Sequence, residues 1–334
     1  MAIEKVEEKN HRILVLGIFI LLFIASLFIS VGNGAVKITP SEIIQSVIFE
    51  ENAVNYQIIW NVRLPRTIVA GLVGICLSLS GAILQGIMRN PLASPSIIGV
   101  SAGGGLMALT ILILFPHLYY LVPLGAFLGS LGATLFIYAL AWKDGVLPTR
   151  LILAGVAVSS LLSAGTNSLM TFFPDRVTGV IGFMVGGLSA TTWQDVKMIL
   201  PYTIIGVVSL LVLSEKLNIL MLGDEIATGL GLNVERTRFI FIIISSLLAG
   251  SAVSVVGLLG FIGLIVPHMT RLFIGSDYNY LFPGTIFFGA ALLIICDTLA
   301  RVLFAPIEIP VGIIMSALGA PFFLYLLRSR EGTR

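Results

Sequence analysis

The sequence has few charged residues for its length. Asp, Glu, Lys and Arg make up 11% of its 334 residues, whereas a soluble domain has about 25% charged residues. So little charge excludes a soluble globular protein. Hydrophobic residues make up 57% of the chain, which is enough for many segments of the roughly 20 apolar residues that a membrane-spanning helix needs.

The sequence also lacks most groups that catalytic and cofactor sites use. Its two cysteines, Cys76 and Cys296, lie in apolar segments, where we expect inert buried thiols and no disulfide. His268 has no carboxylate or second histidine near it in sequence, which argues against a metal site. No Gly-x-x-x-x-Gly-Lys-Ser/Thr loop is present, so that mode of ATP binding is excluded. The basic residues form no run that would follow nucleic acid, and we expect no enzymatic activity, cofactor or nucleic-acid partner.

Apolar segments between charged or Pro- and Gly-rich breaks predict an all-α membrane protein with about ten spanning helices. The eighth segment is too short to cross a hydrocarbon core of about 30 Å, so we expect a helix buried in protein. We expect residues 1–334 to form a single transmembrane domain. The predicted segments are 13–31, 67–88, 96–115, 122–142, 151–172, 196–214, 239–258, 260–270, 281–303 and 311–327.

The distribution of Lys and Arg predicts a multi-pass protein of the cell membrane with both termini in the cytoplasm. An N-terminus placed inside leaves most of the 19 Lys and Arg residues on the cytoplasmic side. Segments 67–151 and 239–311 start from opposite sides, and each has a long helix followed by a Gly- and Pro-broken stretch. This pattern resembles the inverted repeats of transporters. The basic residues left outside are Lys37, Arg63, Arg66, Arg176, Lys197 and Arg301.

Arginines at the predicted outer ends of two spans depart from the positive-inside trend. Arg63 and Arg66 precede the second span, where Pro65 suits a helix start. One interpretation is a pair of interfacial anchors. The other is a docking site for acidic side chains of an external partner, because arginine binds carboxylates with two parallel hydrogen bonds. Arg301 lies on the same side, four residues after Asp297, and this spacing allows the two charges to neutralise each other.

Three further patterns lie in the spans and inner loops. Prolines break the chain around Asn90 and Leu92, which indicates a tight loop or a constriction at the cytoplasmic mouth of a pore. The spacing of small residues in the second span favours a helix-packing seam. The fifth span carries polar residues on one helical face, and we interpret this face as lining a transport pathway. These pathway candidates are Ser160, Ser163, Asn167 and Thr171.

The longest predicted inner loop, residues 215–238, contains a short helix signal. Asp224 and Glu225 favour a helix N-terminus, and glycines stop the helix within two turns. The loop is either a solvated linker or a binding site for a cytoplasmic partner. The residues of this candidate loop are Gly223, Asp224, Glu225, Gly229 and Gly231.

From Arg63 to the C-terminus, the order and spacing of these motifs resemble the FecCD family. This family comprises permease subunits of type II ABC importers for iron–siderophores, haem and cobalamin. The motifs that carry the resemblance are Arg63-Leu64-Pro65-Arg66, Ser80-Gly81-Ala82, Asn90-Pro91-Leu92-Ala93, Gly260-Phe261-Ile262-Gly263-Leu264 and Ile309-Pro310-Val311-Gly312.

The resemblance implies a lipid-embedded assembly of two permease subunits, two cytoplasmic ATPases and an extracytoplasmic binding protein. It implies that Arg63, Arg66 and Arg301 pair with glutamates of the binding protein, and that the loop 223–232 sits on an ATPase. It also implies a cytoplasmic gate at Asn90 and Leu92, with Thr149 in the loop of a second gate. The expected cargo is a ferric siderophore. Haem and cobalamin are the alternative cargoes. An ion-coupled secondary transporter is the alternative mechanism.

Overall fold

The computed structural model describes residues 2–34, 39, 54–95, 99–143 and 147–331, and within these ranges it is helical with no strand. Seven helices are long and apolar enough to cross a membrane, and three shorter apolar helices accompany them. Each predicted segment overlaps one of these helices. The all-α membrane fold is therefore confirmed, while the number of crossings stays a prediction. The apolar helices are α1 (Ala2–Gly32), α4 (Leu64–Ile87), α5 (Val100–Leu114), α6 (Val122–Ala141), α7 (Pro148–Phe172), α9 (Trp193–Met221), α11 (Val234–Val256), α12 (Ile262–Ile274), α13 (Tyr278–Val302) and α14 (Val311–Glu331).

Short helical pieces join the apolar helices. They lie mainly at the turns that connect one long helix to the next. These pieces are α3 (Val54–Ile58), the π-helical turn Ile59–Arg63, the 3-10 turns Pro116–Leu121 and Pro174–Val180, α8 (Ile181–Val185) and α10 (Asp224–Gly229).

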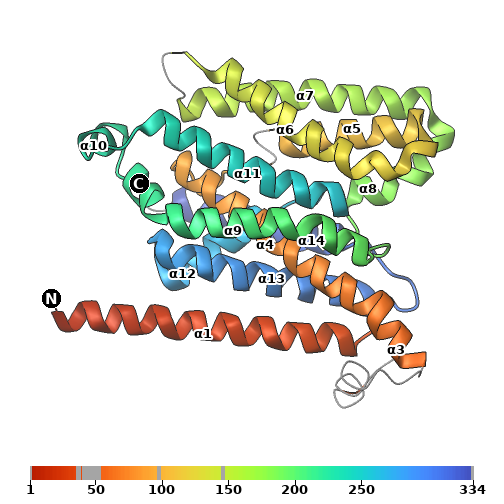
Figure 1. The fold of residues 1–334 in the computed structure, drawn as a ribbon, viewed down its shortest axis with the longest axis horizontal. Helices are drawn as coiled ribbons and strands as arrows, with labels where there is room; N and C mark the ends of the chain where they lie inside the picture. The colour runs from red at the N-terminus through yellow and green to blue at the C-terminus, as the bar shows by residue number, and fades with distance from the viewer. Residues whose placement is uncertain (1, 35–38, 40–53, 96–98, 144–146, 332–334) are drawn as a thin grey trace.

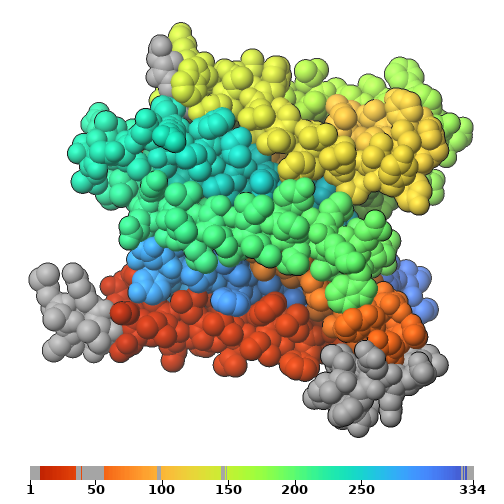
Figure 2. Space-filling model, in the orientation of Figure 1, coloured from red at the N-terminus to blue at the C-terminus, as the bar shows by residue number. Residues whose placement is uncertain are grey.

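Helix α4 is the most buried of the seven long helices, and α9, α11, α12 and α13 pack around it. Helix α1 lies along α13 at one side, and α5, α6 and α7 form a group at the other side (Figure 1). On the face shown in Figure 2, α9 runs between these two sides. The N-terminus, α10 and the C-terminus lie at one end of the molecule, and α3 and α8 lie at the opposite end.

Small residues allow α4 to approach its neighbours closely. A Cβ atom on Gly74 would collide with the backbone of Gly289 in α13, and one on Gly81 would collide with the backbone of Gly263 in α12. Helices in membranes associate through such close backbone contacts because lipid supplies no hydrophobic drive between them. The predicted packing seam on this helix is therefore confirmed.

Several helices extend beyond their predicted limits. Helix α9 continues through Glu215 and Lys216 to Met221, and α11 begins at Val234, where the side chain of Asn233 caps it. The predicted long inner loop is therefore mostly helical. A helix that has left the bilayer can carry charged side chains because water solvates them. The predicted first residues of the third span, 96–98, lie outside the described residues.

The predicted helix start at Pro65 is confirmed for α4, which begins at Leu64 and has Pro65 in its first turn, although helical backbone also precedes it. The apolar helix runs without interruption from Tyr56 to Ile87, because α3 and a π-helical turn lead directly into α4. Arg63 therefore lies within helical backbone and not in a loop before it.

The two predicted halves share a pattern. Helix α4 and helix α11 run in opposite directions (Figure 1). Each is followed by a break and then by a short helix that starts after a residue with left-handed backbone. These residues are Gly99, with φ 73°, before α5 and Phe261, with φ 67°, before α12. This arrangement agrees with the predicted inverted-topology halves.

Candidate functional site

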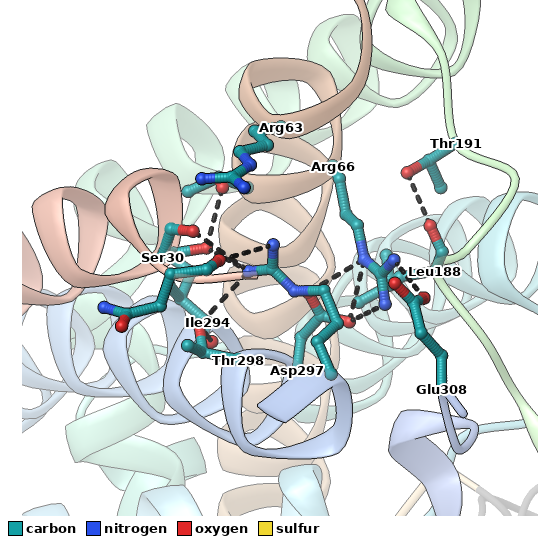
Figure 3. Close-up of polar contacts among 12 residues, drawn as sticks. Ser30, Arg63, Arg66, Leu188, Thr191, Ile294, Asp297, Thr298 and Glu308 are labelled. Carbon is teal, nitrogen blue, oxygen red and sulfur yellow. Dashed lines mark hydrogen bonds and ion pairs between the residues drawn. The ribbon is translucent and has the colours of Figure 1, made fainter. Parts of the chain in front are cut away.

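The structure brings the three predicted outer arginines into one cluster, where α1, α4 and α13 meet (Figure 3). Arg66, in the first turn of α4, donates hydrogen bonds to Asp297 from two nitrogens. Its Nη2 lies 2.9 Å from Oδ1, and its Nε lies 3.0 Å from Oδ2. Arg66 Nη1 donates to Glu308 Oε2 at 2.7 Å. Two carboxylates of the same chain therefore hold the guanidinium group of Arg66.

Arg301 and Arg63 bind α1 to this cluster. Arg301 Nη2 donates to Ser30 Oγ at 2.8 Å, and its Nε lies 3.3 Å from Asp297 Oδ2. Arg63 Nη1 donates to the carbonyl oxygen of Val31 at 2.7 Å. The predicted pairing of Asp297 with Arg301 is confirmed, but Asp297 makes its closer, two-nitrogen contact with Arg66.

Burial distinguishes this cluster from a surface patch. The side chains of Asp297, Arg301 and Arg66 are 1%, 4% and 7% exposed, whereas the side chain of Glu308 is 44% exposed. Glu308 is therefore the most exposed of these four side chains. The three arginines and two carboxylates give the cluster a formal charge of +1.

Sequence reasoning missed Ser30 and Glu308 as partners of these arginines. Ser30 carried no signal, because serines are common on faces where helices pack. Glu308 did carry one, because it is the only charged residue of the segment 302–327. A lone carboxylate among apolar residues of a membrane protein indicates a partner of opposite charge.

The predicted inner gate residues form the turn that ends α4. The backbone N–H of Asn90 donates to the carbonyl oxygen of Gln85 at 3.1 Å, and the N–H of Leu92 donates to Asn90 Oδ1 at 3.0 Å. Leu92 packs against the main hydrophobic core. Thr149 is exposed in the first turn of α7, and no described contact brings it to this turn.

The short helix predicted from Asp224 is confirmed as α10. Gly223, with φ 112°, precedes it, and Gly231, with φ 83°, follows it, so both glycines hold backbone conformations that other residues rarely adopt. Asp224 accepts hydrogen bonds from two arginines, Arg89 and Arg238. Sequence reasoning missed both, since Arg89 lies in the turn after α4 and Arg238 lies in α11, both outside the short helix.

The predicted pathway residues of α7 divide into two pairs. Ser163 and Asn167 line an open cavity of about 300 Å³, together with other hydroxyl-bearing side chains. The hydroxyl groups of Ser160 and Thr171 instead donate to carbonyl oxygens of their own helix, each at 2.8 Å. The cavity is lined by Ser101, Ala102, Gly105, Ser159, Ser163, Thr166, Asn167, Met184 and Leu258.

A second cavity of about 190 Å³ borders the first and shares Ser101 and Leu258 with it. It is lined also by Ser94 and Pro95 near the inner turn and by Phe261 at the start of α12. Among the described residues, no three His, Cys, Asp or Glu side chains are grouped so that they could hold a metal ion. The site thus offers neutral hydrogen-bonding groups within the helices and charged clusters at their two ends.

These features lie within a chain whose relatives are known. The FecCD transport family matches residues 20–329. The chain belongs to this family. It is 39% identical over 323 residues to the Fe(3+)-citrate import system permease protein YfmE of Bacillus subtilis, with 96% of each chain covered. It is 39% identical over 330 residues to the hemin transport system permease protein HmuU of Yersinia pestis, covering 95% of this chain and 96% of that protein.

The fold also matches a solved structure of an inward-facing metal-chelate type ABC transporter. The TM-score is 0.85 at 30% identity, with 94% of this chain and 99% of the other chain covered. This FecCD chain is therefore a multi-pass membrane protein and a permease subunit of an ABC importer. Its family relatives are transport subunits and not enzymes.

Proposed function

We propose that this permease moves a ferric siderophore into the cell. The observation that carries the proposal is the match to an iron(III)–citrate permease over 96% of both chains. The cavity beside α7 supports it, because the residues that line it include hydroxyl and amide groups but no charged side chain. A bare Fe³⁺ ion is a hard cation that prefers charged oxygen ligands such as carboxylates, whereas a chelated ion already has its oxygen ligands. Haem or cobalamin is the alternative cargo.

Uptake into proteoliposomes tests the cargo. The permease is reconstituted with its co-purifying ATPase and with its binding protein, and four radiolabelled probes are compared: a ferric hydroxamate, ferric citrate, haem and cyanocobalamin. ATP-dependent uptake of a ferric chelate supports the proposal. Uptake of haem or cobalamin alone would refute the proposed siderophore cargo but not the assignment as an importer subunit. Uptake that needs an ion gradient and no ATP would refute the assignment as an ATP-driven importer.

The proposed assembly contains two permease subunits around a central pathway, two cytoplasmic ATPases that hydrolyse ATP, and an external binding protein. Each permease chain is a single transmembrane domain with both termini in the cytoplasm. The structure supports this orientation, because the N-terminus, α10 and the C-terminus lie at one end of the molecule (Figure 1). The charged cluster around Arg66 then faces the outside.

The pathway is proposed to run along α7, past Ser160, Ser163, Asn167 and Thr171. Its cytoplasmic gate is formed by Asn90 and Leu92 on one side and by Thr149 on the other. The two cavities that share Ser101 support this route, because together they extend from the polar face of α7 to Ser94 and Pro95 near the inner turn.

The loop around α10 is proposed to couple the permease to an ATPase through Gly223, Asp224, Glu225, Gly229 and Gly231. The two later glycines allow a sharp test. Gly231 has φ 83°, where valine is strained, whereas a Cβ atom on helical Gly229 would meet nothing within 4 Å. Gly231→Val should lower uptake per ATP hydrolysed strongly, and Gly229→Val should lower it less. Equal coupling in Gly231→Val and the parent chain would contradict the proposal.

Arg63, Arg66 and Arg301 are proposed to receive acidic side chains of the binding protein. Reversing the charge of Arg66 is a poor test, because it would also break the buried contact with Asp297. Arg63→Gln keeps a donor for the carbonyl oxygen of Val31 and removes the charge. Binding of the binding protein to the permease in nanodiscs should weaken while the unfolding temperature stays unchanged. Unaltered affinity would refute docking at Arg63.

A further inference from the structure

Arg89 occupies an unusual position at the inner end of α4. Its backbone is left-handed, with φ 46°. The N–H of Arg89 donates to the carbonyl oxygen of Gly86, and the N–H of Asn90 to that of Gln85, each at 3.1 Å. These two bonds define the Schellman motif, in which glycine usually takes the left-handed position. An arginine there is disfavoured, and such strain persists where the side chain has a use.

The side chain of Arg89 reaches α10. Its Nη2 lies 3.3 Å from Oδ1 of Asp224, the first residue of that helix. The same carboxylate accepts two hydrogen bonds from Nη2 of Arg238 in α11, at 3.0 and 3.1 Å. One carboxylate thus ties α10 both to α11 and to the turn that follows α4.

The other side of α10 is open to a partner. Leu222, Ile226 and Leu230 are 56%, 55% and 62% exposed, and within α10 only Ala227 is buried. Figure 2 shows this turquoise end of the molecule extending beyond α9. A protein seated on these apolar side chains would displace α10 as a unit, and Asp224 would move with it.

We propose that the Arg89–Asp224 ion pair transmits movement of α10 to the turn that contains Asn90 and Leu92. This inference rests on the proposed function, in which α10 seats an ATPase and the turn forms the cytoplasmic gate. Arg238 holds Asp224 with two contacts and fixes α10 to α11. Arg89 holds it with one longer contact and passes the displacement to the end of α4. Arg89 and Asp224 are positioning residues, since neither lines the cavities beside α7.

The decisive variant is Arg89→Gly. Glycine is favoured at φ 46°, so the end of α4 should keep or gain stability while the link to Asp224 is lost. Arg89→Lys keeps the charge and should retain part of the link. Arg236→Gln is the matched control, because Arg236 is an exposed arginine at the same end of the molecule.

Gate movement is read from a Leu92→Cys chain in complex with its co-purifying ATPase. The readout is the rate of modification by a fluorescent maleimide, with and without ATP and vanadate. The chain without this cysteine gives the background, because Cys76 and Cys296 are buried. ATP should change the rate in the parent complex and in Arg236→Gln. Arg89→Gly should lose this change while it retains ATP hydrolysis and its unfolding temperature.

Two results would overturn the link. The first is an ATP-driven change in Arg89→Gly as large as in the parent complex, which would make the pair a solvated contact of no consequence. The second is a lower unfolding temperature or failed assembly of Arg89→Gly, which would assign Arg89 a purely structural role. If no ATPase binds the parent chain, or if ATP leaves Leu92→Cys unchanged there, the proposed function itself fails and the link fails with it.

Discussion

Both ends of α4 present an arginine to a carboxylate, but in different surroundings. At the outer end, Arg66 and Asp297 have side chains that are 7% and 1% exposed. At the inner end, Arg89 and Asp224 have side chains that are 41% and 38% exposed. The outer arginine binds with two nitrogens, and the inner arginine makes one contact of 3.3 Å.

This difference assigns different tasks to the two contacts. A charge removed from water is costly to leave unpaired, so the outer pair holds its helices in one arrangement. A half-exposed pair is solvated when it opens and is weakened by salt, so the inner contact can break and form again as helices move. We infer that the outer end of α4 is an anchor and the inner end a movable joint.

The largest effect is expected from Asp297→Asn. The substitution leaves two buried guanidinium groups, those of Arg66 and Arg301, without their shared carboxylate. Removing one partner of a buried ion pair costs about 3–5 kcal/mol, so the unfolding temperature in detergent should fall sharply. Asp175→Asn, the same change at an exposed site, is the control and should leave the unfolding temperature unchanged. Equal unfolding temperatures of both variants would show that the outer cluster is no anchor.

An intermediate effect is expected from Arg238→Gln. Arg238 pairs with Asp224 and Glu235 near the inner end of α4, and its side chain is only 1% exposed. Its loss leaves Asp224 and Glu235 partly exposed, at 38% and 35%, where water can solvate them. The cost should therefore be about 1.5–3 kcal/mol, that of lost hydrogen bonds to a charged group. A thermal shift as large as that of Asp297→Asn would contradict the contrast between the two ends.

Local patterns predicted much of the fold. Apolar runs located every apolar helix, because each span must satisfy its backbone internally and fill the bilayer with apolar side chains. The short helix at Asp224 followed from an acidic start and from glycines that end it. Helix limits were predicted less well where helices continue past the apolar segments. The charged residues Glu215 and Lys216 do not end α9, which continues to Met221, because water can solvate their side chains.

The sites were harder to predict than the helices. The outer arginines could be identified from the sequence because they depart from the positive-inside rule. The contact between Arg66 and Glu308 could not be predicted in the same way, since the two residues are 242 positions apart in the chain and only the packing of α4 against α13 brings them together. Arg89 carried no signal, because its left-handed backbone and its reach to Asp224 depend on how α4 ends and where α10 lies.

The smallest effect is expected from Glu308→Gln, which tests the boundary of the outer anchor. Glu308 binds the same guanidinium as Asp297 but from the exposed side, so solvent screens the contact. Its loss should cost less than about 1 kcal/mol, and the unfolding temperature should match that of Glu215→Gln, an exposed control. A shift approaching that of Asp297→Asn would extend the anchor to the loop before α14. An unchanged unfolding temperature with tighter binding of the binding protein would instead show that Glu308 competes with the partner's carboxylates for Arg66.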